Sequence, residues 1–185
     1  MYIMNNIIAI IRDEDFGLKG NELVNPITRY ASRGIVFNDN GEIAIFHKIH
    51  KNEYKLPGGG INENENKKEA FCREILEETG CKISDIKELG ITIEEKGKTN
   101  FRQISYIFSA KVIEDTKKLK LTQKEKEEGG ELLWLDIDKA YNLVCNCINQ
   151  IIGSKYDSKY QTLFMVKRDA LIINNYLQKN KSIKK

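Results

Sequence analysis

The chain has 185 residues, and its 30 basic and 27 acidic residues leave a formal net charge of +3. A chain of this length can bury a real core, so we predict a single domain over residues 1–185. The small charge gives no reason to expect nucleic acid as an obligate partner. The apolar run Ile7–Ile11 is far too short to span a membrane, and no Lys or Arg precedes it, so neither an anchor nor a signal peptide is indicated.

The four cysteines do not form a metal-binding pattern, because neither their spacing nor a nearby His supports one. They are Cys72, Cys81, Cys145 and Cys147. We interpret them as reduced, buried thiols of a cytoplasmic protein.

Strand signals dominate the first quarter of the chain. Ile7–Arg12 has the composition of a short strand, and Asp13–Asn25 that of a polar loop. Two further strands, Ser32–Asn38 and Glu42–Lys48, flank the sequence Asp39-Asn40-Gly41. Because Asn-Gly is a strong hairpin signal, we predict that these two strands pair.

A glycine-rich loop and a helix follow. Tyr54–Leu56 leads into Pro57-Gly58-Gly59-Gly60, whose glycines allow close backbone approach to a ligand. The next helix is predicted over Lys67 to Thr79, with Gly80 as a left-handed C-cap. At about 100° per residue, its apolar and acidic residues fall on opposite arcs. The apolar arc, expected to face the core, holds Phe71, Cys72, Ile75, Leu76 and Thr79; the other holds Ala70, Glu74, Glu77 and Glu78.

The three glutamates of this helix are spaced i, i+3 and i+4, so their carboxylates crowd together. Each pair of like charges would destabilise an isolated helix by roughly 0.2–0.5 kcal/mol, and a cation would relieve the repulsion. Hard carboxylate oxygens suit Mg²⁺ or Mn²⁺ rather than Zn²⁺. Arg73 is placed to pair with a carboxylate, although a substrate phosphate is also within its chemistry.

A second hairpin is predicted between Lys87–Glu94 and Arg102–Val112, across the turn Glu95–Asn100. In the latter strand two sets of residues alternate. One set is Ile104, Tyr106, Phe108 and Ala110, and the other is Gln103, Ser105, Ile107 and Ser109. We expect the first set to face the core and the second to be mostly exposed.

The C-terminal third is predicted to hold one strand and two helices. Leu132–Asp136 is the strand, and Asp138–Ile152 an amphipathic helix that Asp138 could cap. Ser158–Gln178 is a long final helix, followed by Lys179–Lys185, a basic and solvated tail. Strands mixed with helices in this order predict an α+β fold with a mixed sheet.

The segment from Gly59 to Cys81 resembles the Nudix box of the Nudix hydrolases. It runs Gly59, five residues, Glu65, seven residues, Arg73-Glu74-Ile75, one residue, Glu77-Glu78, one residue, Gly80-Cys81. Every fixed position of the box is matched. Only Cys81 departs, standing where a bulky aliphatic residue is usual, and this affects packing rather than chemistry. The resemblance implies a Nudix-type α/β/α sandwich with a mixed central sheet.

The resemblance also implies roles for individual positions. Glu77 and Glu78 would be metal ligands, Glu74 a ligand or the base for the attacking water, and the Gly58 carbonyl a further ligand. Arg73 would pair with Glu65 and hold the loop in place. Glu65, Gly59 and Gly80 would be structural residues of the motif. Members often add one acid from a distant loop; the candidates are Glu125, Glu127, Glu128 and Glu131. We favour Glu128, which lies six residues before Trp134.

The implied reaction is Mg²⁺- or Mn²⁺-dependent hydrolysis of a small-molecule diphosphate linked to another moiety, X. The proline typical of ADP-ribose members and the tyrosine typical of diadenosine polyphosphate members are absent after the box. A nucleoside triphosphate, including an oxidised one, is the largest remaining substrate class. The alternatives are an RNA 5′-end pyrophosphohydrolase and a non-catalytic nucleotide-sensing module.

Substrate-binding residues and the choice between monomer and homodimer stay open at this point. Several residues near the box are of types that read or stack on a base, but each is also typical of packing or surface positions. They are Arg29, Tyr30, Arg33, Tyr54, Phe101, Arg102 and Tyr106.

Overall fold

The computed structural model describes residues 6–153 and 159–183. Its strands are β1 (Ile7–Arg12), β2 (Ile27–Phe37), β3 (Ile43–Lys48), β4 (Glu53–Lys55), β5 (Gly58–Gly60), β6 (Cys81–Lys96), β7 (Phe101–Asp115) and β8 (Gly130–Leu135). Its α-helices are α1 (Lys67–Thr79), α2 (Gln123–Glu127), α3 (Ile137–Gly153) and α4 (Lys159–Ile183). Short 3-10 turns are η1 (Asp13–Phe16), η2 (Ile49–Lys51) and η3 (Gly97–Thr99).

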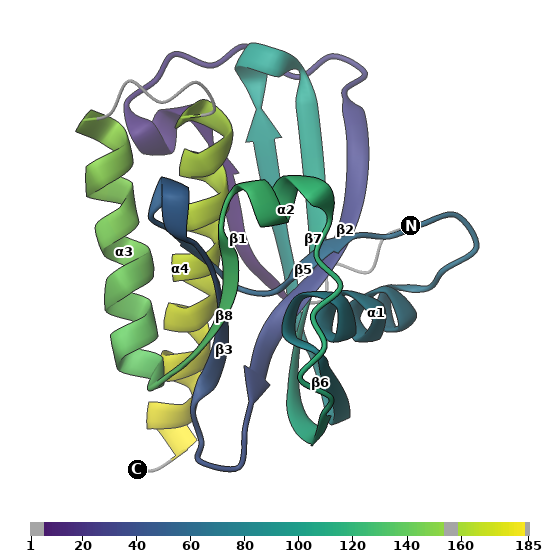
Figure 1. The fold of residues 1–185 in the computed structure, drawn as a ribbon. Coiled ribbons are helices and arrows are strands. Elements are labelled where there is room, and N and C mark those ends of the chain that lie inside the picture. Colours follow the sequence, from purple (N-terminus) through teal and green to yellow (C-terminus); the bar gives the residue numbers. More distant parts are fainter. Residues whose placement is uncertain (1–5, 154–158, 184–185) are drawn as a thin grey trace.

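The strands form one mixed sheet in the order β1-β6-β7-β2-β3-β4, with β5 paired to β2 and β8 paired to β3 (Figure 1). β2 is parallel to β7 and β1 is parallel to β6, whereas the other pairs are antiparallel. The predicted hairpin is present, with Phe37 of β2 opposite Ile43 of β3. Beyond that turn β3 pairs with β4 and β8, while β2 continues beside β5 and β7.

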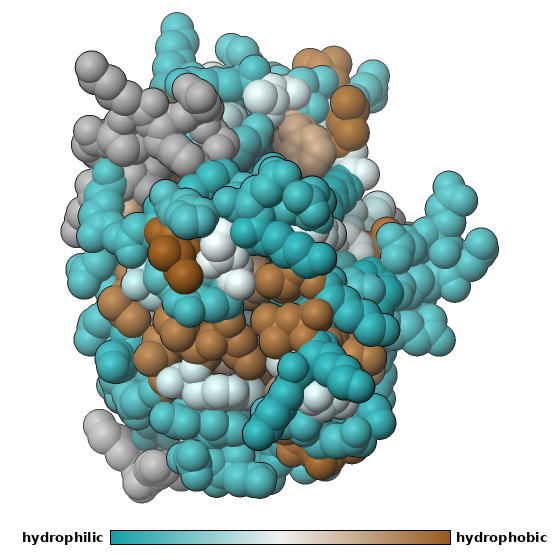
Figure 2. All heavy atoms as spheres, viewed as in Figure 1, coloured by the Kyte–Doolittle hydropathy of each residue, from teal (hydrophilic) through white to brown (hydrophobic). Residues whose placement is uncertain are grey.

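Helices cover both faces of the sheet, because the central strands carry apolar side chains on both faces. Ile35 and Ile107 point into a core under α3 and α4, and their neighbours Val36 and Phe108 point into a second core under α1. Successive side chains of a strand face opposite ways, so central strands between two helical layers are apolar on both faces. The predicted α/β/α sandwich is confirmed. On the face shown in Figure 2, hydrophilic residues cover α1 and α2, and a hydrophobic band lies below α2 over β8.

The prediction that one face of β7 is mostly exposed was wrong. Gln103, Ser105, Ile107 and Ser109 are all buried. β7 lies between β6 and β2 rather than at an edge, and α4 covers the face that these residues share. The Gln103 amide donates a hydrogen bond to Glu94 at 2.7 Å, so this polar side chain belongs to a buried polar cluster and not to the surface.

Several strand boundaries also differ from the prediction. β2 begins at Ile27 rather than at Ser32, because its first residues pair in parallel with the start of β7. β6 begins at Cys81, directly after α1, rather than at Lys87. The loop predicted over Asp13–Asn25 opens with the η1 turn.

The helix of the glycine-rich region has the predicted bounds, Lys67–Thr79. Asn66 accepts hydrogen bonds from the first turn, and Gly80 is left-handed (φ 71°) and donates to the Leu76 carbonyl. The two predicted arcs are less distinct than expected. Ala70 and Glu78, both on the acidic arc, are buried, because the glycine loop and β2 cover this side of the helix.

The C-terminal helices correct two further expectations. The cap of α3 is Asp136, whose carboxylate accepts from the backbone N–H groups of Asp138 and Lys139 at 2.9 and 3.2 Å. α4 extends to Ile183, so residues 179–183 of the predicted solvated tail are helical, and residues 184–185 lie outside the described ranges. Within residues 6–153 and 159–183, no helix is both long enough and apolar enough to cross a membrane.

All four cysteines are free thiols. Cys81 and Cys147 are buried as predicted, and burial raises the pKa of both thiols. Cys72 and Cys145 are only partly buried, which corrects the expectation for these two residues.

The cap assignment at α3 gives a stability prediction with a matched control. Asp136→Ala removes the acceptor of two N–H groups and should lower the free energy of unfolding by about 1 kcal/mol. Asp138→Ala should lower it by clearly less, since Asp138 accepts neither of these two bonds. Urea unfolding measures both variants. Equal losses, or a larger loss for Asp138→Ala, would contradict the assignment.

Candidate active site

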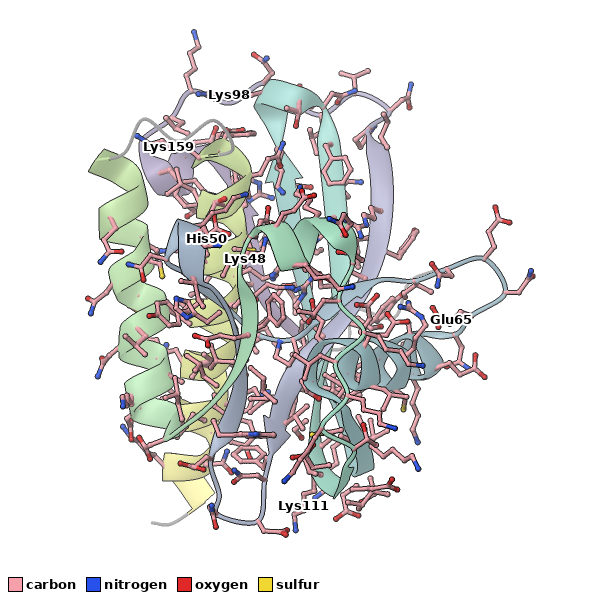
Figure 3. All side chains as sticks on the ribbon, viewed as in Figure 1. Lys48, His50, Glu65, Lys98, Lys111 and Lys159 are labelled. Carbon is pink, nitrogen blue, oxygen red and sulfur yellow. The ribbon has the colours of Figure 1, made fainter. Side chains whose placement is uncertain are left out.

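The glycine loop, α1 and the first half of α4 line one cavity of about 600 Å³. It lies beneath α2, in the region where Lys48 is labelled in Figure 3. Among the described residues, ten basic and seven acidic side chains line it. The cavity is therefore net cationic even though it contains the three glutamates of α1, which favours a polyanionic ligand.

Arg73 joins the loop to the helix. Its Nε and Nη2 donate to the two carboxylate oxygens of Glu65 at 2.7 and 3.0 Å, and Nη2 also donates to the Gly60 carbonyl at 2.8 Å. Its Nη1 donates to Glu74 at 2.7 Å and to Glu77 at 3.1 Å. The hydrogen bond from Arg73 holds the pKa of Glu65 below its usual value. Figure 3 shows Glu65 on the loop that precedes α1.

Glu78, the third acid of the helix, is buried and bound from two sides. Lys55 Nζ lies 2.5 Å from one carboxylate oxygen, and the Gly58 N–H donates to the other at 2.8 Å. Burial nevertheless raises the pKa of Glu78. The sequence analysis did not assign Lys55 to the site. Its signal was weak: a charged residue in a short strand next to the glycine loop.

Gly58 is required for steric reasons. It has φ +140°, and a Cβ there would overlap the Ser32 carbonyl and the Arg33 backbone, because β5 pairs closely with β2. A Cβ at Gly59 would overlap the Glu74 carboxylate, so a side chain there would displace that acid.

The donor chemistry of the site fits Mg²⁺ or Mn²⁺. Carboxylates and loop carbonyls are available, and no His or Cys is found among the described residues that line the cavity. As placed, however, no three acidic, His or Cys side chains in the described part of the chain converge to hold an ion. The reason is that Glu78 turns to Lys55, whereas Glu74 and Glu77 turn to Arg73. An ion here would take over carboxylate oxygens that two internal cations hold.

Two of the four candidate distal acids line the cavity, Glu125 and Glu128. Glu128 is bound by Lys48 at 2.8 Å and by Lys51 at 2.6 Å, and these two cations keep its pKa below the usual value although burial opposes them. Glu125 is near enough to Glu78 for its charge to raise the pKa of that group. The structure therefore offers Glu125 beside the favoured Glu128.

The other two candidate acids are engaged elsewhere. Glu127 accepts from Gln123 on the exposed side of α2 at 2.9 Å, and Glu131 binds His47 at 2.8 Å. Neither lines the cavity.

The far end of the cavity is a buried charged cluster that the sequence analysis missed. Arg168 of α4 binds Glu94 at 3.1 Å and Asp169 at 2.8 Å, and Lys96 lies 3.3 Å from Glu94. Asp169 also accepts the Leu56 backbone N–H at 3.0 Å, just before the glycine loop. An Arg-Asp pair within an apolar stretch of helix was the available signal, since buried charges rarely occur unpaired.

Only some of the residues that could read or stack on a base also line the cavity. Arg29, Arg33 and Phe101 line the cavity. The others lie elsewhere: Tyr54 stacks on His47 with ring centroids 4.2 Å apart, Arg102 pairs with Glu95, and Tyr30 and Tyr106 flank a separate surface hollow.

Comparison with known proteins agrees with this geometry. A family model described as "NUDIX domain" matches residues 28–148, which is more than half of the chain. The fold is similar to a crystal structure titled MutT protein from Methanosarcina mazei Go1, at 23% identity and a TM-score of 0.54, covering 85% of this chain and 99% of that one. A NUDIX hydrolase from Nitrosomonas europaea has 20% identity and a TM-score of 0.52, over 68% and 89% of the two chains.

Curated relatives match over shorter segments. A protein named RNA pyrophosphohydrolase from Ectopseudomonas mendocina is 38% identical over 58 residues, which is 31% of this chain and 36% of the relative. One of the same name from Halorhodospira halophila is 25% identical over 114 residues, 55% of this chain and 63% of the relative. The matched segments thus span between about a third and under two thirds of these relatives.

The buried cluster predicts a pH-dependent stability. Burial raises the pKa of Glu94, but Arg168 and Lys96 outweigh it and hold that pKa below the usual value. A lowered folded-state pKa stabilises the fold above the unfolded value of about 4.3, and this stabilisation is lost as the pH falls below it. Glu94→Gln should therefore cost about 3 kcal/mol at pH 7, and the gap to the parent should narrow below about pH 4.

Urea unfolding across this range measures the effect, with Glu22→Gln, an exposed site, as the control. A gap that stays constant with pH, or is absent at pH 7, would contradict the charge assignment.

Proposed function

The chain belongs to the Nudix family, and from this we propose that it is a hydrolase that cleaves a diphosphate linkage with the help of Mg²⁺ or Mn²⁺. The observation that carries the proposal is that one cavity contains the complete acid set of α1, the glycine loop and an excess of basic side chains. A diphosphate needs all three: acids for a metal, backbone that approaches closely, and cations for the phosphate oxygens.

In this proposal Glu77, Glu78 and the Gly58 carbonyl hold the ion, and Glu74 is either a further ligand or the base for the attacking water. When bound, the ion supplies a water of lowered pKa and neutralises phosphate oxygens. Arg73 positions Glu74 and Glu77 through its hydrogen bonds and anchors the loop through Glu65. Gly59 leaves the space that the Glu74 carboxylate occupies.

The choice of distal acid depends on which group is free to accept a proton. Glu128, the residue favoured from sequence, is held by two lysines and has a lowered pKa, so it is a poor base as placed. Its proposed part is to position Lys48 and Lys51 in the cavity. Glu125 is the better candidate for a direct part, because it lines the cavity on the side of Glu78.

The proposed substrate is a nucleoside triphosphate. The net cationic lining suits a triphosphate, and Phe101 provides an aromatic surface in the same cavity for a base. The substrate is small on this reading, because all these features lie within one cavity of about 600 Å³.

A second candidate is the triphosphorylated 5′ end of RNA. It is favoured by the name of the curated relatives, RNA pyrophosphohydrolase. The basic tail does not add to it, because α4 contributes Arg168 to the cavity and then runs away from it toward Lys179, about 16 Å further along the helix axis (Figure 1).

A hydrolysis screen tests the proposal, with substrates and products separated by chromatography because the cleaved products are phosphate esters, pyrophosphate or phosphate. The panel is nucleoside triphosphates, oxidised nucleoside triphosphates, nucleoside diphosphate sugars with an uncharged sugar and 5′-triphosphorylated RNA, each with Mg²⁺ and with chelator. We expect Mg²⁺-dependent cleavage of triphosphates. Glu77→Gln should lower kcat by at least a hundredfold, because a metal ligand is lost while the exposed side chain leaves the fold intact.

Glu63→Gln, an exposed residue of the same loop region, is the control and should keep full activity. Stoichiometric nucleotide binding without cleavage of any substrate would establish the sensing alternative instead. Cleavage that persists in Glu77→Gln would refute the role of the box acids.

A further inference from the structure

Arg33 is a buried cation with no directly bound partner among the residues that the structure describes. It is 5% exposed, and among the described residues no hydrogen bond or ion pair reaches its guanidinium. It stands two residues before Ile35 in β2, so its side chain lies on the α4 face of the sheet and lines the cavity. A buried charge without a direct counter-ion is unfavourable, and carboxylates that act only at longer range offset it incompletely.

A second guanidinium faces the same space. Arg168 is 2% exposed; its Nε and Nη1 are bound by Asp169 and Glu94, but its Nη2 has no hydrogen-bond partner. Burial and the positive charge of Arg168 lower the pKa of Arg33 to about 10, although the negative charges of Asp169, Glu94 and Glu78 oppose them. Two cations that repel each other across a cavity, each with an unused N–H group, form an incomplete site.

We propose that Arg33 and Arg168 form a subsite for an anionic group, a phosphate or a carboxylate, carried by the X side of the substrate. This inference rests on the proposed diphosphate hydrolysis, in which X is the group joined to the scissile diphosphate. An anion is favoured over a neutral base edge because a neutral acceptor would satisfy N–H groups but would leave Arg33 without a directly bound counter-ion.

The subsite adjoins the box, so one substrate can reach both. Arg33 is directly opposite Gly58 in the pairing of β2 with β5, and Gly58 donates to Glu78. The scissile diphosphate would lie over the glycine loop, with the anionic group of X on the α4 side. In a nucleoside triphosphate the terminal phosphate is such a group.

The proposed subsite depends on α4 as well as on the strands next to the box. Arg168 comes from a helix that lies wholly outside the segment matched by the family model, residues 28–148. The same helix places Gln161 and Thr162 on the cavity wall, where they bind Lys96 and Glu53. α4 thereby fixes the orientation of charged residues around the subsite.

Binding without turnover tests the subsite by itself. The probe is inorganic phosphate in chelator, read by the melting temperature of the parent, Arg33→Met, Arg33→Lys and Arg102→Gln. Arg102 lies outside the cavity and pairs with Glu95, so it is the matched control. Without phosphate, Arg33→Met should melt higher than the parent, because an unpaired buried charge is removed. Phosphate should raise the melting temperature of the parent and of Arg102→Gln, weakly that of Arg33→Lys, and not that of Arg33→Met.

Kinetics then identify the source of the anion. The substrates are ATP, with a terminal phosphate, UDP-glucuronate, with a carboxylate, and UDP-glucose, with neither. If X presents a phosphate, Arg33→Met should raise the KM for ATP at least tenfold. If X presents a carboxylate, it should raise the KM for UDP-glucuronate by the same factor. In either case the rise should be at least ten times larger than any change in the KM for UDP-glucose.

Two results would overturn the subsite. One is a phosphate response that Arg33→Met retains, and the other is an equal loss on all three substrates, which would place Arg33 on the scissile diphosphate. Failure of the wider proposal is separate: a parent that binds phosphate through Arg33 but hydrolyses nothing keeps the subsite and rejects the hydrolase.

Discussion

Charge compensation on the acidic face of α1 is the constraint on which the site depends. Three glutamates within five residues repel one another, and the chain itself supplies the cations that offset them. Arg73 binds two of these acids and the loop, while Lys55 binds the buried third. The loop and helix are thus held together by the same charges that a divalent ion would use, so binding of an ion would be coupled to local order.

The C-terminal helix provides the second support. Asp169 accepts the Leu56 N–H immediately before the glycine loop, and Arg168 reaches β6 through Glu94. Thr162 donates to Glu53 of β4 at 3.1 Å. One face of α4 therefore fixes the strands that deliver the loop, and the same face closes the cavity. With the proposed subsite, one helix would combine recognition with support, which gives its buried charges a part that apolar residues could not take.

Local signals were enough to predict α1 and its C-cap, because Gly80 and the residue spacing of the helix act within a few residues, whereas the N-cap Asn66 was not predicted. The hairpin before the loop followed from Asn-Gly, whereas the residue pattern alone indicated only a mixed sheet with helices, and the sandwich was implied by the resemblance of the box. Lys55, Arg33 and Arg168 could not be assigned, since their meeting depends on sheet order and on α4 packing, which no short pattern encodes. The same reason explains the error on β7: Gln103 looked exposed because its buried partner, Glu94, lies on another strand.

The central claim is that the α1 acids form a divalent-ion site, and a melting scan tests it most directly. The parent and a Glu74→Gln, Glu77→Gln, Glu78→Gln triple variant are compared in chelator, Mg²⁺ and Ca²⁺. At a hundred times its Kd an ion should stabilise the parent by about 2.7 kcal/mol. Both ions should therefore raise the melting temperature of the parent and leave that of the triple variant unchanged. A parent that ignores both ions, or a triple variant that responds as strongly, would contradict the account.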